Sequence, residues 1–408
     1  MDFETSLRES LDLAASRELL RVPGAYEPLG SRVVSDGHVL VSFASNDYLG
    51  LADAPALQGA IADAALLRAG GTSSRVVVGT SSAHRAAEAT LAELVGLPTA
   101  RVFSSAYAAN VGLLGSLFGS DDVLLSDSLN HASLIDGCRL SRARVEVFRH
   151  RDVDHLSYLL RKHARTARVT AIITETVFSM DGDIADVAVL ERLARDHGAA
   201  LVADEAHALG VVGPSGSGIC ALADVRPDVL VGGLGKSFGL AGGFLAGSAT
   251  LGRAIDNFVR TYVFSTAILP PIAHAIPVSV SLLRDANDDR ARLARHAGRL
   301  RDVACDLGCT VLGAAPAAIV PIVIGSADDA VQASAALRSL GLLVPAMRPP
   351  TVPDRTARLR ITPTARHSEE EISMLCTALR QVLGSPGDHH HEHERDHPQQ
   401  HSDSHRLP

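Results

Sequence analysis

Short apolar runs alternate with helical patterns between about residues 50 and 250. Polar or glycine residues follow each run, and the runs are ARVFSS, DVLLSD, RVEVFR, TAIITET, AALVADEA and DVLVGG. Strands that are apolar on both faces are typical of a mostly parallel sheet covered by helices. The pattern predicts an α/β fold. Functional residues are expected where these strands end, because ligands bind at the carboxyl ends of such strands.

The flanking segments predict smaller units. Residues 1–24 look like an amphipathic helix, and a hairpin follows with its turn at Asp36-Gly37. A long helical stretch at about 267–306 leads to strand-like and helical segments, with a helix cap at Ser326 and a capping box at Ser368 and Glu371. We therefore expect an N-terminal segment over 1–45, a large domain over 46–266, and a linking helix with a small α+β domain over 267–384.

Composition excludes several classes of protein. A net charge of −8 argues against a general nucleic-acid binder. No run reaches the ~18 apolar residues of a membrane span, and the first residues lack the basic start of a signal peptide. The five cysteines form no CxxC pair and are interpreted as reduced thiols. We expect a cytoplasmic protein with no nucleic-acid or membrane partner.

The last segment, 385–408, holds seven of the 18 histidines and almost no apolar side chain. Such a composition predicts disorder. A metal-scavenging tail is the alternative, but nothing fixes a coordination geometry, so no metal site is predicted.

One lysine, Lys236, lies among six glycines in GGLGKSFGLAGG, residues 232–243. Such a lysine either grips a nucleotide phosphate or holds an aldehyde as a Schiff base. A P-loop needs a glycine at position 230, which is Leu230, so the spacing fails. A pyridoxal phosphate (PLP) site is the remaining interpretation.

A PLP site needs further groups, and candidates follow three of the predicted strands. Asp204 ends a strand and suits the pyridine nitrogen, with His207 three residues on. Ser105, Ala106 and Tyr107 enter a helix and can present N–H groups to a phosphate. His131 is suited to stack on a flat ring. Each has a structural alternative: Asp204 as a turn cap, and His131 as a loop histidine with satisfied hydrogen bonds.

Taken in series, several motifs resemble the α-oxoamine synthases, PLP enzymes of fold type I. The match covers about residues 40–380, and the motifs are SNDYLGL, GTSSRVVVGTSSAHRAAE, NHASLIDG, TETVFSMDGD, VADEAHALG, GGLGKSFG and FSTAILPP. The resemblance implies a seven-stranded, mostly parallel sheet in a large domain and a small α+β C-terminal domain. The segment VPAMRPPTVPDRTARLRITPTARHS is most similar to the branch that joins L-alanine to pimeloyl-CoA or a pimeloyl carrier protein, in biotin biosynthesis.

The resemblance also implies roles for individual residues and a homodimer with shared active sites. Lys236 would hold PLP and act as the base, Asp204 would bind the ring nitrogen, and His131 would stack on the ring. His207 and Ser179 would lie near the phenolic oxygen. The phosphate would bind at residues 105–107 with help from Ser265 and Thr266 of a second subunit, and Arg360 and Arg21 would bind substrate.

Three positions depart from the family pattern. Gly233 replaces a usual Thr or Ser, while Ala208 and Ala106 replace usual glycines. Ser237 or Ser105 is expected to compensate for the hydroxyl that is missing at position 233. The alternatives are another α-oxoamine synthase, such as a glycine-using ketobutyrate ligase or a secondary-metabolism relative, a PLP-binding protein without catalysis, and a metal-binding protein that uses its tail.

Overall fold

The computed structural model describes residues 2–16, 19–20, 22–163 and 166–384. The predicted disordered tail over 385–408 and the predicted substrate residue Arg21 therefore lie outside the described residues.

A central sheet of seven strands has the order β4-β10-β9-β8-β7-β5-β6. The strands are Thr99–Phe103 (β4), Val123–Asp127 (β5), Arg144–Phe148 (β6), Thr170–Glu175 (β7), Ala200–Asp204 (β8), Val229–Gly233 (β9) and Gly243–Gly247 (β10). β10 runs antiparallel to both of its neighbours, and the other neighbouring strands are parallel. The predicted mostly parallel seven-stranded sheet is confirmed, and all six apolar runs are strands.

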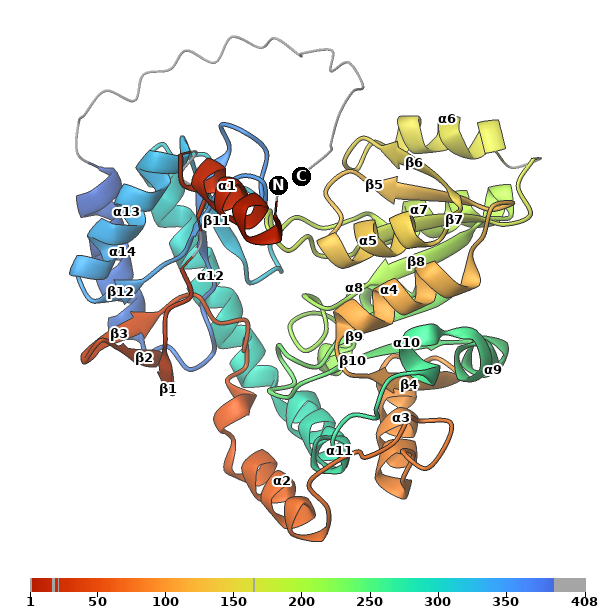
Figure 1. The fold of residues 1–408 in the computed structure, drawn as a ribbon. Coiled ribbons are helices and arrows are strands. Elements are labelled where there is room, and N and C mark those ends of the chain that lie inside the picture. Colours follow the sequence, from red (N-terminus) through yellow and green to blue (C-terminus); the bar gives the residue numbers. More distant parts are fainter. Residues whose placement is uncertain (1, 17–18, 21, 164–165, 385–408) are drawn as a thin grey trace.

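Alternate residues of the inner strands enter cores on opposite faces of the sheet. In β7, Ile172 packs in one core and Ile173 in the other. Helices cover both faces, as Figure 1 shows. The helices of this part of the chain are Pro55–Leu67 (α2), Ser82–Leu94 (α3), Ala106–Leu117 (α4), Ala132–Leu140 (α5), Val153–His163 (α6), Val187–His197 (α7), Ile219–Leu222 (α8), Ala249–Phe258 (α9), Arg260–Val263 (α10) and Pro270–Asp285 (α11); α2 packs on α11 below the sheet.

Strand β6 departs from the expectation of a strand buried on both faces. It lies at the edge of the sheet, and Val145 and Val147 are exposed. The apolar run RVEVFR therefore predicts a strand correctly but predicts its burial wrongly, because only one neighbour, β5, pairs with it.

The two ends of the described chain form one small unit beside the large sheet. A four-stranded sheet contains three N-terminal strands, Glu27–Leu29 (β1), Arg32–Ser35 (β2) and His38–Ser42 (β3). Its fourth strand, Leu342–Leu343 (β12), comes from the C-terminal part of the chain and pairs with β3. Figure 1 shows this red hairpin against the blue C-terminal elements. The latter are Asn287–Asp306 (α12), Val320–Gly325 (β11), Ala327–Ser339 (α13), Ala346–Met347 (β13), Ala357–Ile361 (β14) and Glu369–Leu383 (α14). The N-terminal hairpin is thus part of the small unit.

The sequence predicts the positions of the hairpin turn and of the capping box correctly. It predicts the lengths of the helices less accurately. Asp36 and Gly37 have positive φ at the hairpin turn, and Ser368 with Glu371 forms the capping box of α14. The stretch 267–306, expected to be one long helix, is two helices that break at Ala286.

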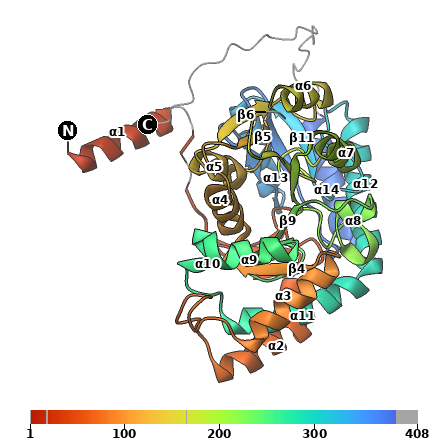
Figure 2. The same cartoon turned by 90° about the vertical axis from the view of Figure 1, so that its right-hand side faces the viewer.

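The first helix, Phe3–Ser16 (α1), is shorter than the predicted helix over 1–24 and has no buried residue. Figure 2 shows it extending away from the rest of the molecule. None of the described helices combines the length and apolar character needed to cross a bilayer.

Candidate active site

Lys236 lies on the turn between β9 and β10. Leu234 N donates to Gly242 O at 3.0 Å, and Gly239, with φ of 66°, donates its N–H to Lys236 O at 2.9 Å. Burial lowers the pKa of the Lys236 amine to about 8, although Asp204 and Glu175 oppose this shift; Arg360 adds to it. The turn therefore holds an amine that loses its proton far more readily than an ordinary lysine does.

Asp204 ends β8 and is almost fully buried, at 6% exposure. Its Oδ2 accepts a hydrogen bond from Asn110 Nδ2 at 2.7 Å, and its Oδ1 accepts from Ala206 N at 2.9 Å. The bond to Ala206 is the turn cap expected as a structural alternative. A cap alone does not account for the second bond, which comes from helix α4.

His131 is the N-cap residue of α5 and is close enough to Asp204 and Lys236 for both charges to affect it. Burial lowers the pKa of its imidazole, Asp204 opposes that shift, and Lys236 adds to it. Its Nδ1 lies 2.8 Å from Ser133 Oγ, and the ring of Tyr107 meets it edge-on at 6.5 Å between centroids.

Arg360 lies on β14 of the small unit, and its guanidinium is close enough to His207 for its charge to affect that imidazole. Its Nε donates to Ser179 O at 2.7 Å, and its two terminal nitrogens donate to Asn46 Oδ1 at 3.3 and 3.2 Å. His207 is buried, and its Nδ1 lies 2.8 Å from the hydroxyl of Tyr48. Burial, with Lys236 and Arg360, lowers the pKa of His207 well below its usual value, so this imidazole is neutral.

Arg360 does not form a surface ion pair. Its side chain is 3% exposed, and no carboxylate of the described residues lies within 4.0 Å of it. Arg358, two residues before it, does pair with Asp181. A buried guanidinium without a carboxylate is costly unless a ligand supplies one.

Glu175 also belongs to this site, although no sequence motif marks it as a functional residue. It ends β7, its Oε2 accepts from Ser179 N at 3.2 Å, and no described residue donates to its Oε1. Burial, together with the charge of Asp204, raises its pKa well above the usual value, against the opposing effect of Lys236. The signal available in the sequence was its position at a strand end.

The start of α4 presents backbone N–H groups. Ser105 caps the helix by accepting from Ala108 N at 3.0 Å. The first N–H groups of a helix have no partner within it, so those of Ala106 and Tyr107 remain for a ligand. Gly243 of β10 lies against this turn, since a Cβ there would meet Ala106 N at 2.3 Å.

Gly233 leaves no hydroxyl at its own position. A Cβ at Gly233 would lie 3.1 Å from Ala206 Cβ and 3.8 Å from Ala106 Cβ. Ser237 packs against Gly210 instead, and its buried hydroxyl has no hydrogen-bond partner among the described residues. The hydroxyl oxygen of Ser105 accepts the cap bond from Ala108 N, which leaves its hydrogen available to a phosphate, so compensation by Ser105 stays a prediction.

Ser265 and Thr266 follow α10, and Thr266 forms a bridge with Ser74. Thr266 is exposed, and Ser265 lines a groove with residues of α4, α5 and α10. No contact in the described chain joins either residue to Lys236 or Asp204. Their expected action on the site of a second subunit stays a prediction.

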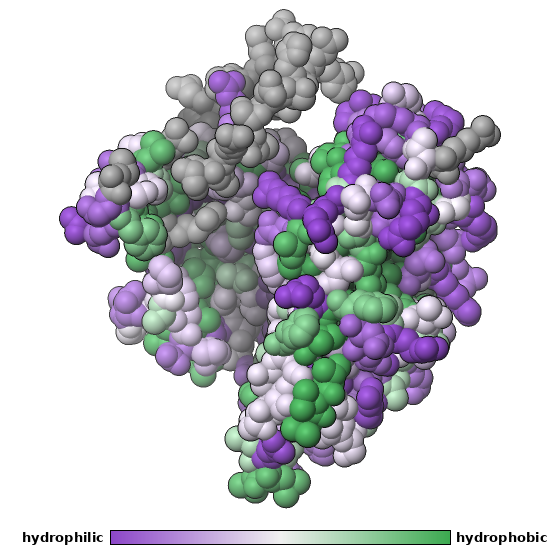
Figure 3. All heavy atoms as spheres, turned by 45° about the vertical axis from the view of Figure 1, so that its right-hand side comes forward, coloured by the Kyte–Doolittle hydropathy of each residue, from purple (hydrophilic) through white to green (hydrophobic). Residues whose placement is uncertain are grey.

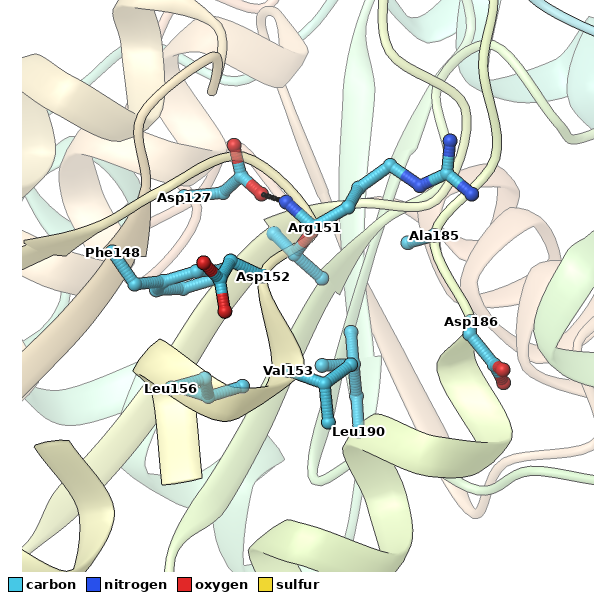
Figure 4. A pocket seen from close by; sticks show the side chains of 10 residues that line it. Asp127, Phe148, Arg151, Asp152, Val153, Leu156, Ala185, Asp186 and Leu190 are labelled. Atoms are coloured by element: carbon cyan, nitrogen blue, oxygen red, sulfur yellow. Dashed lines mark hydrogen bonds between the residues drawn. The ribbon is translucent and has the colours of Figure 1, made fainter. Parts of the chain in front are cut away.

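A separate cavity of about 320 Å³ lies at the carboxyl ends of β5, β6 and β7. Figure 4 shows its lining, including Asp127, whose carboxylate accepts from Arg151 N at 3.0 Å. Asp152 accepts from His155 N and Asp186 from Val189 N, so these carboxylates serve as local caps. The cavity contains neither Lys236 nor its partners, and we do not assign the chemistry to it.

The assembled residues fit PLP. Lys236 offers an amine of lowered pKa, Asp204 a carboxylate fixed by two hydrogen bonds, and α4 two N–H groups suited to a phosphate. Arg360 adds a cation for a substrate carboxylate.

Comparisons with known proteins agree with this site. The profile of the family described as aminotransferase class I and II matches residues 38–379. An 8-amino-7-oxononanoate synthase from Pseudomonas putida is 44% identical over 376 residues, which cover 91% of this chain and 94% of that protein.

Two solved structures are similar over nearly the whole chain. A serine palmitoyltransferase from Sphingomonas wittichii has a TM-score of 0.86 and 30% identity, covering 94% of this chain and 98% of that one. A serine palmitoyltransferase from S. paucimobilis, solved with PLP and myriocin bound, has a TM-score of 0.87 and 27% identity, covering 94% and 99%.

Proposed function

The chain belongs to the aminotransferase class I and II family, and from this membership and the site we infer the activity of an 8-amino-7-oxononanoate synthase. The reaction joins L-alanine to a pimeloyl thioester with loss of carbon dioxide, in biotin biosynthesis. The observation that carries the inference is the meeting of Lys236, Asp204 and an unpaired, buried Arg360 in one site.

PLP, when bound, supplies an electron sink that stabilises negative charge at the α-carbon of the amino acid. Lys236 would hold its aldehyde, Asp204 its ring nitrogen, and Ala106 and Tyr107 its phosphate. His131 would lie against the ring, and His207 and Ser179 near its phenolic oxygen.

Lys236 is the base in this proposal. An amine with a pKa of about 8 is partly neutral at physiological pH, so it can accept the α-proton of alanine and later return it. An ordinary lysine, with a pKa of 10.5, would be almost fully protonated.

Arg360 orients the amino acid by binding its carboxylate with a planar guanidinium. Asn46 and Ser179 hold that guanidinium in place. Arg21, which the resemblance assigns to substrate binding, stays a prediction.

We propose a homodimer with shared active sites. Five large apolar side chains are exposed near the Ser74–Thr266 bridge and on the neighbouring helices, namely Val76, Val77, Val78, Phe258 and Phe264. Figure 3 shows hydrophobic surface on the lower part of the molecule in that view. A second copy covering these residues would bring Ser265 and Thr266 to its phosphate turn. We also propose a cytoplasmic location, which suits a biosynthetic enzyme.

Product identification tests the function. Purified protein with PLP, L-alanine and pimeloyl-CoA should give 8-amino-7-oxononanoate by mass spectrometry. Parallel reactions with glycine or serine and with other acyl thioesters test the other α-oxoamine synthases. Lys236→Ala is the control and should give no product. Absence of product from every pair, with PLP bound, would favour a PLP-binding protein without catalysis.

A further inference from the structure

Asn110 is a fully buried polar residue in the middle of the otherwise apolar inner face of α4. Its amide nitrogen donates to two acceptors, Asp204 Oδ2 at 2.7 Å and Ser133 Oγ at 2.9 Å. Its own Oδ1 has no partner among the described residues. A buried amide with this arrangement reduces helix propensity and is held there by the two acceptors.

Ser133 continues the connection to His131. The backbone N–H of Ser133 donates to His131 Nδ1 at 3.2 Å, and its Oγ lies 2.8 Å from the same nitrogen. A backbone N–H can only donate, so this contact favours an unprotonated Nδ1, although at 3.2 Å it is longer than the hydroxyl contact at 2.8 Å. Because Asn110 already donates to Ser133 Oγ, the hydroxyl hydrogen is free to donate to Nδ1 as well.

We propose that Asn110 and Ser133 are positioning residues that hold His131 with its proton on Nε2 and tie this ring to the carboxylate of Asp204. His131 is thereby a hydrogen-bond donor toward the site. A donor is what a carbonyl oxygen needs when negative charge develops on it during acyl transfer. Asn110 on α4 and Ser133 on α5 would thus fix two groups relative to each other. These are His131, which would lie against the cofactor ring, and Asp204, which would bind the ring nitrogen.

The surroundings of His131 support this assignment. Burial disfavours the protonated form of its imidazole and Lys236 adds to this effect, while Asp204 and Asp136 favour that form. Tyr107 meets the ring at its edge. Burial therefore outweighs the two carboxylates, which alone would draw a second proton to the imidazole. Two donors directed at Nδ1 disfavour that second proton.

The inference rests on the proposed PLP site, and its first readout is independent of turnover. Imidazole NMR of the histidine-labelled full-length chain, with and without PLP, reports which ring nitrogen carries the proton. The His131 signal is assigned by its loss in His131→Asn. In the unsubstituted protein we expect an unprotonated Nδ1 and a protonated Nε2.

Ser133→Ala and Asn110→Leu are the test variants. Ser133→Ala removes the hydroxyl donor, so His131 should show a mixture of tautomers and a higher pKa than in the unsubstituted protein. Asn110→Leu should give the same mixture and also weaken PLP binding roughly tenfold or more, because it removes a hydrogen bond to the Asp204 carboxylate. Ser133→Ala should change PLP affinity less.

Ser126→Ala is the matched control. Ser126 is also buried and accepts from an asparagine amide, Asn130 Nδ2 at 2.9 Å, but it makes no bond to His131. This variant should leave the His131 tautomer unchanged. The proposal is overturned if Ser133→Ala keeps a pure Nε2–H tautomer, or if Ser126→Ala alters His131 as strongly. Either result stands whether or not the protein makes the expected product.

Discussion

At the scale of single residues, the site depends on charges that lie close together in a buried place. The charges of Asp204 and Glu175 affect the pKa of Lys236, and the charges of Asp204 and Lys236 affect that of Glu175. Arg360 adds a further positive charge near Lys236. Burial disfavours every charged form, while each carboxylate favours a charged lysine. The balance leaves the amine readily deprotonated.

This balance predicts the reactivity of Lys236 in the PLP-free protein. Only the neutral amine is nucleophilic, so labelling by an amine-reactive reagent should rise with pH about a midpoint near 8. Peptide mass spectrometry of the segment that contains Lys236 would follow the labelling. A midpoint at the usual value of 10.5 would contradict the assignment.

Glu175→Gln should move that midpoint further down. Ionised Glu175 raises the pKa of Lys236, and the uncharged amide cannot do so. The expected change is a lower midpoint in the same labelling experiment. An unchanged or higher midpoint would show that Glu175 stays neutral throughout the titration.

The site residues that belong to a sequence motif could be predicted. The residues that form hydrogen bonds to them, Asn110 and Ser133, could not. Lys236 stands out among glycines, and Asp204 stands at the end of an apolar run. Asn110 and Ser133 lie inside helices, where a single polar residue reads as an ordinary exposed position. Only the packing of α4 on α5 and β8 shows that both are buried and bonded.

At the scale of elements, β10 supports the start of α4. Gly243→Ala would place a Cβ 2.3 Å from Ala106 N and 2.4 Å from Ala106 Cα, so backbone has to move. We expect a loss of about 1–3 kcal/mol in the free energy of unfolding and weaker PLP binding. Thermal unfolding and PLP titration would measure both effects.

Gly59→Ala is the matched control for this substitution. Gly59 lies in α2 with open space around the added methyl group. Alanine there should stabilise the protein by about 0.5–1 kcal/mol and leave PLP binding unchanged. Equal losses from both variants would argue against a specific role of the contact with α4.

The sequence missed strand β10 and misjudged the burial of β6, because both depend on neighbouring strands rather than on the residue pattern. GFLAG in β10 is short and begins and ends with glycine, so it gives a weak strand signal; pairing with β4 and β9 makes it a strand. RVEVFR in β6 carries a strong signal, yet its edge position leaves it exposed. Position within a sheet is a tertiary property.

At the scale of the whole molecule, the proposed dimer can be tested at its exposed valines. Val77 and Val78 are each 71% exposed, and charge at both positions would oppose burial against a second copy. The double variant Val77→Asp/Val78→Asp should sediment with the mass of one chain. Tyr158→Ser, on α6 near the opposite edge of the sheet, should sediment like the unsubstituted protein.

Glu371 joins the two ends of the described chain. Burial alone would raise its pKa, but hydrogen bonds from Arg32, Ser368 and Ser31 outweigh burial and lower it. The Arg32 Nε to Glu371 Oε1 distance is 2.7 Å. Glu371→Ala should reduce the free energy of unfolding by about 1 kcal/mol near neutral pH.

The pH dependence of this loss has a definite sign. A carboxyl whose pKa is lower in the folded state stabilises the fold above its unfolded pKa, and that contribution is lost as pH falls through the folded pKa. The difference between Glu371→Ala and the unsubstituted protein should therefore shrink below about pH 4. Thr377→Ala, at an exposed position of α14 that carries no charge, should show no such pH-dependent difference.

The pairing of the N-terminal hairpin with C-terminal elements also affects when the fold can be completed during synthesis. Ser31 meets Glu371 across 340 positions of sequence. At ribosomal speeds of about 5–20 residues per second, roughly 20 to 70 s separate the emergence of these two partners. The inner face of the nascent hairpin stays uncovered through that interval. Arg360, which we propose binds the substrate, is synthesised only near the end of it. Catalytic competence is therefore acquired after translation is nearly finished.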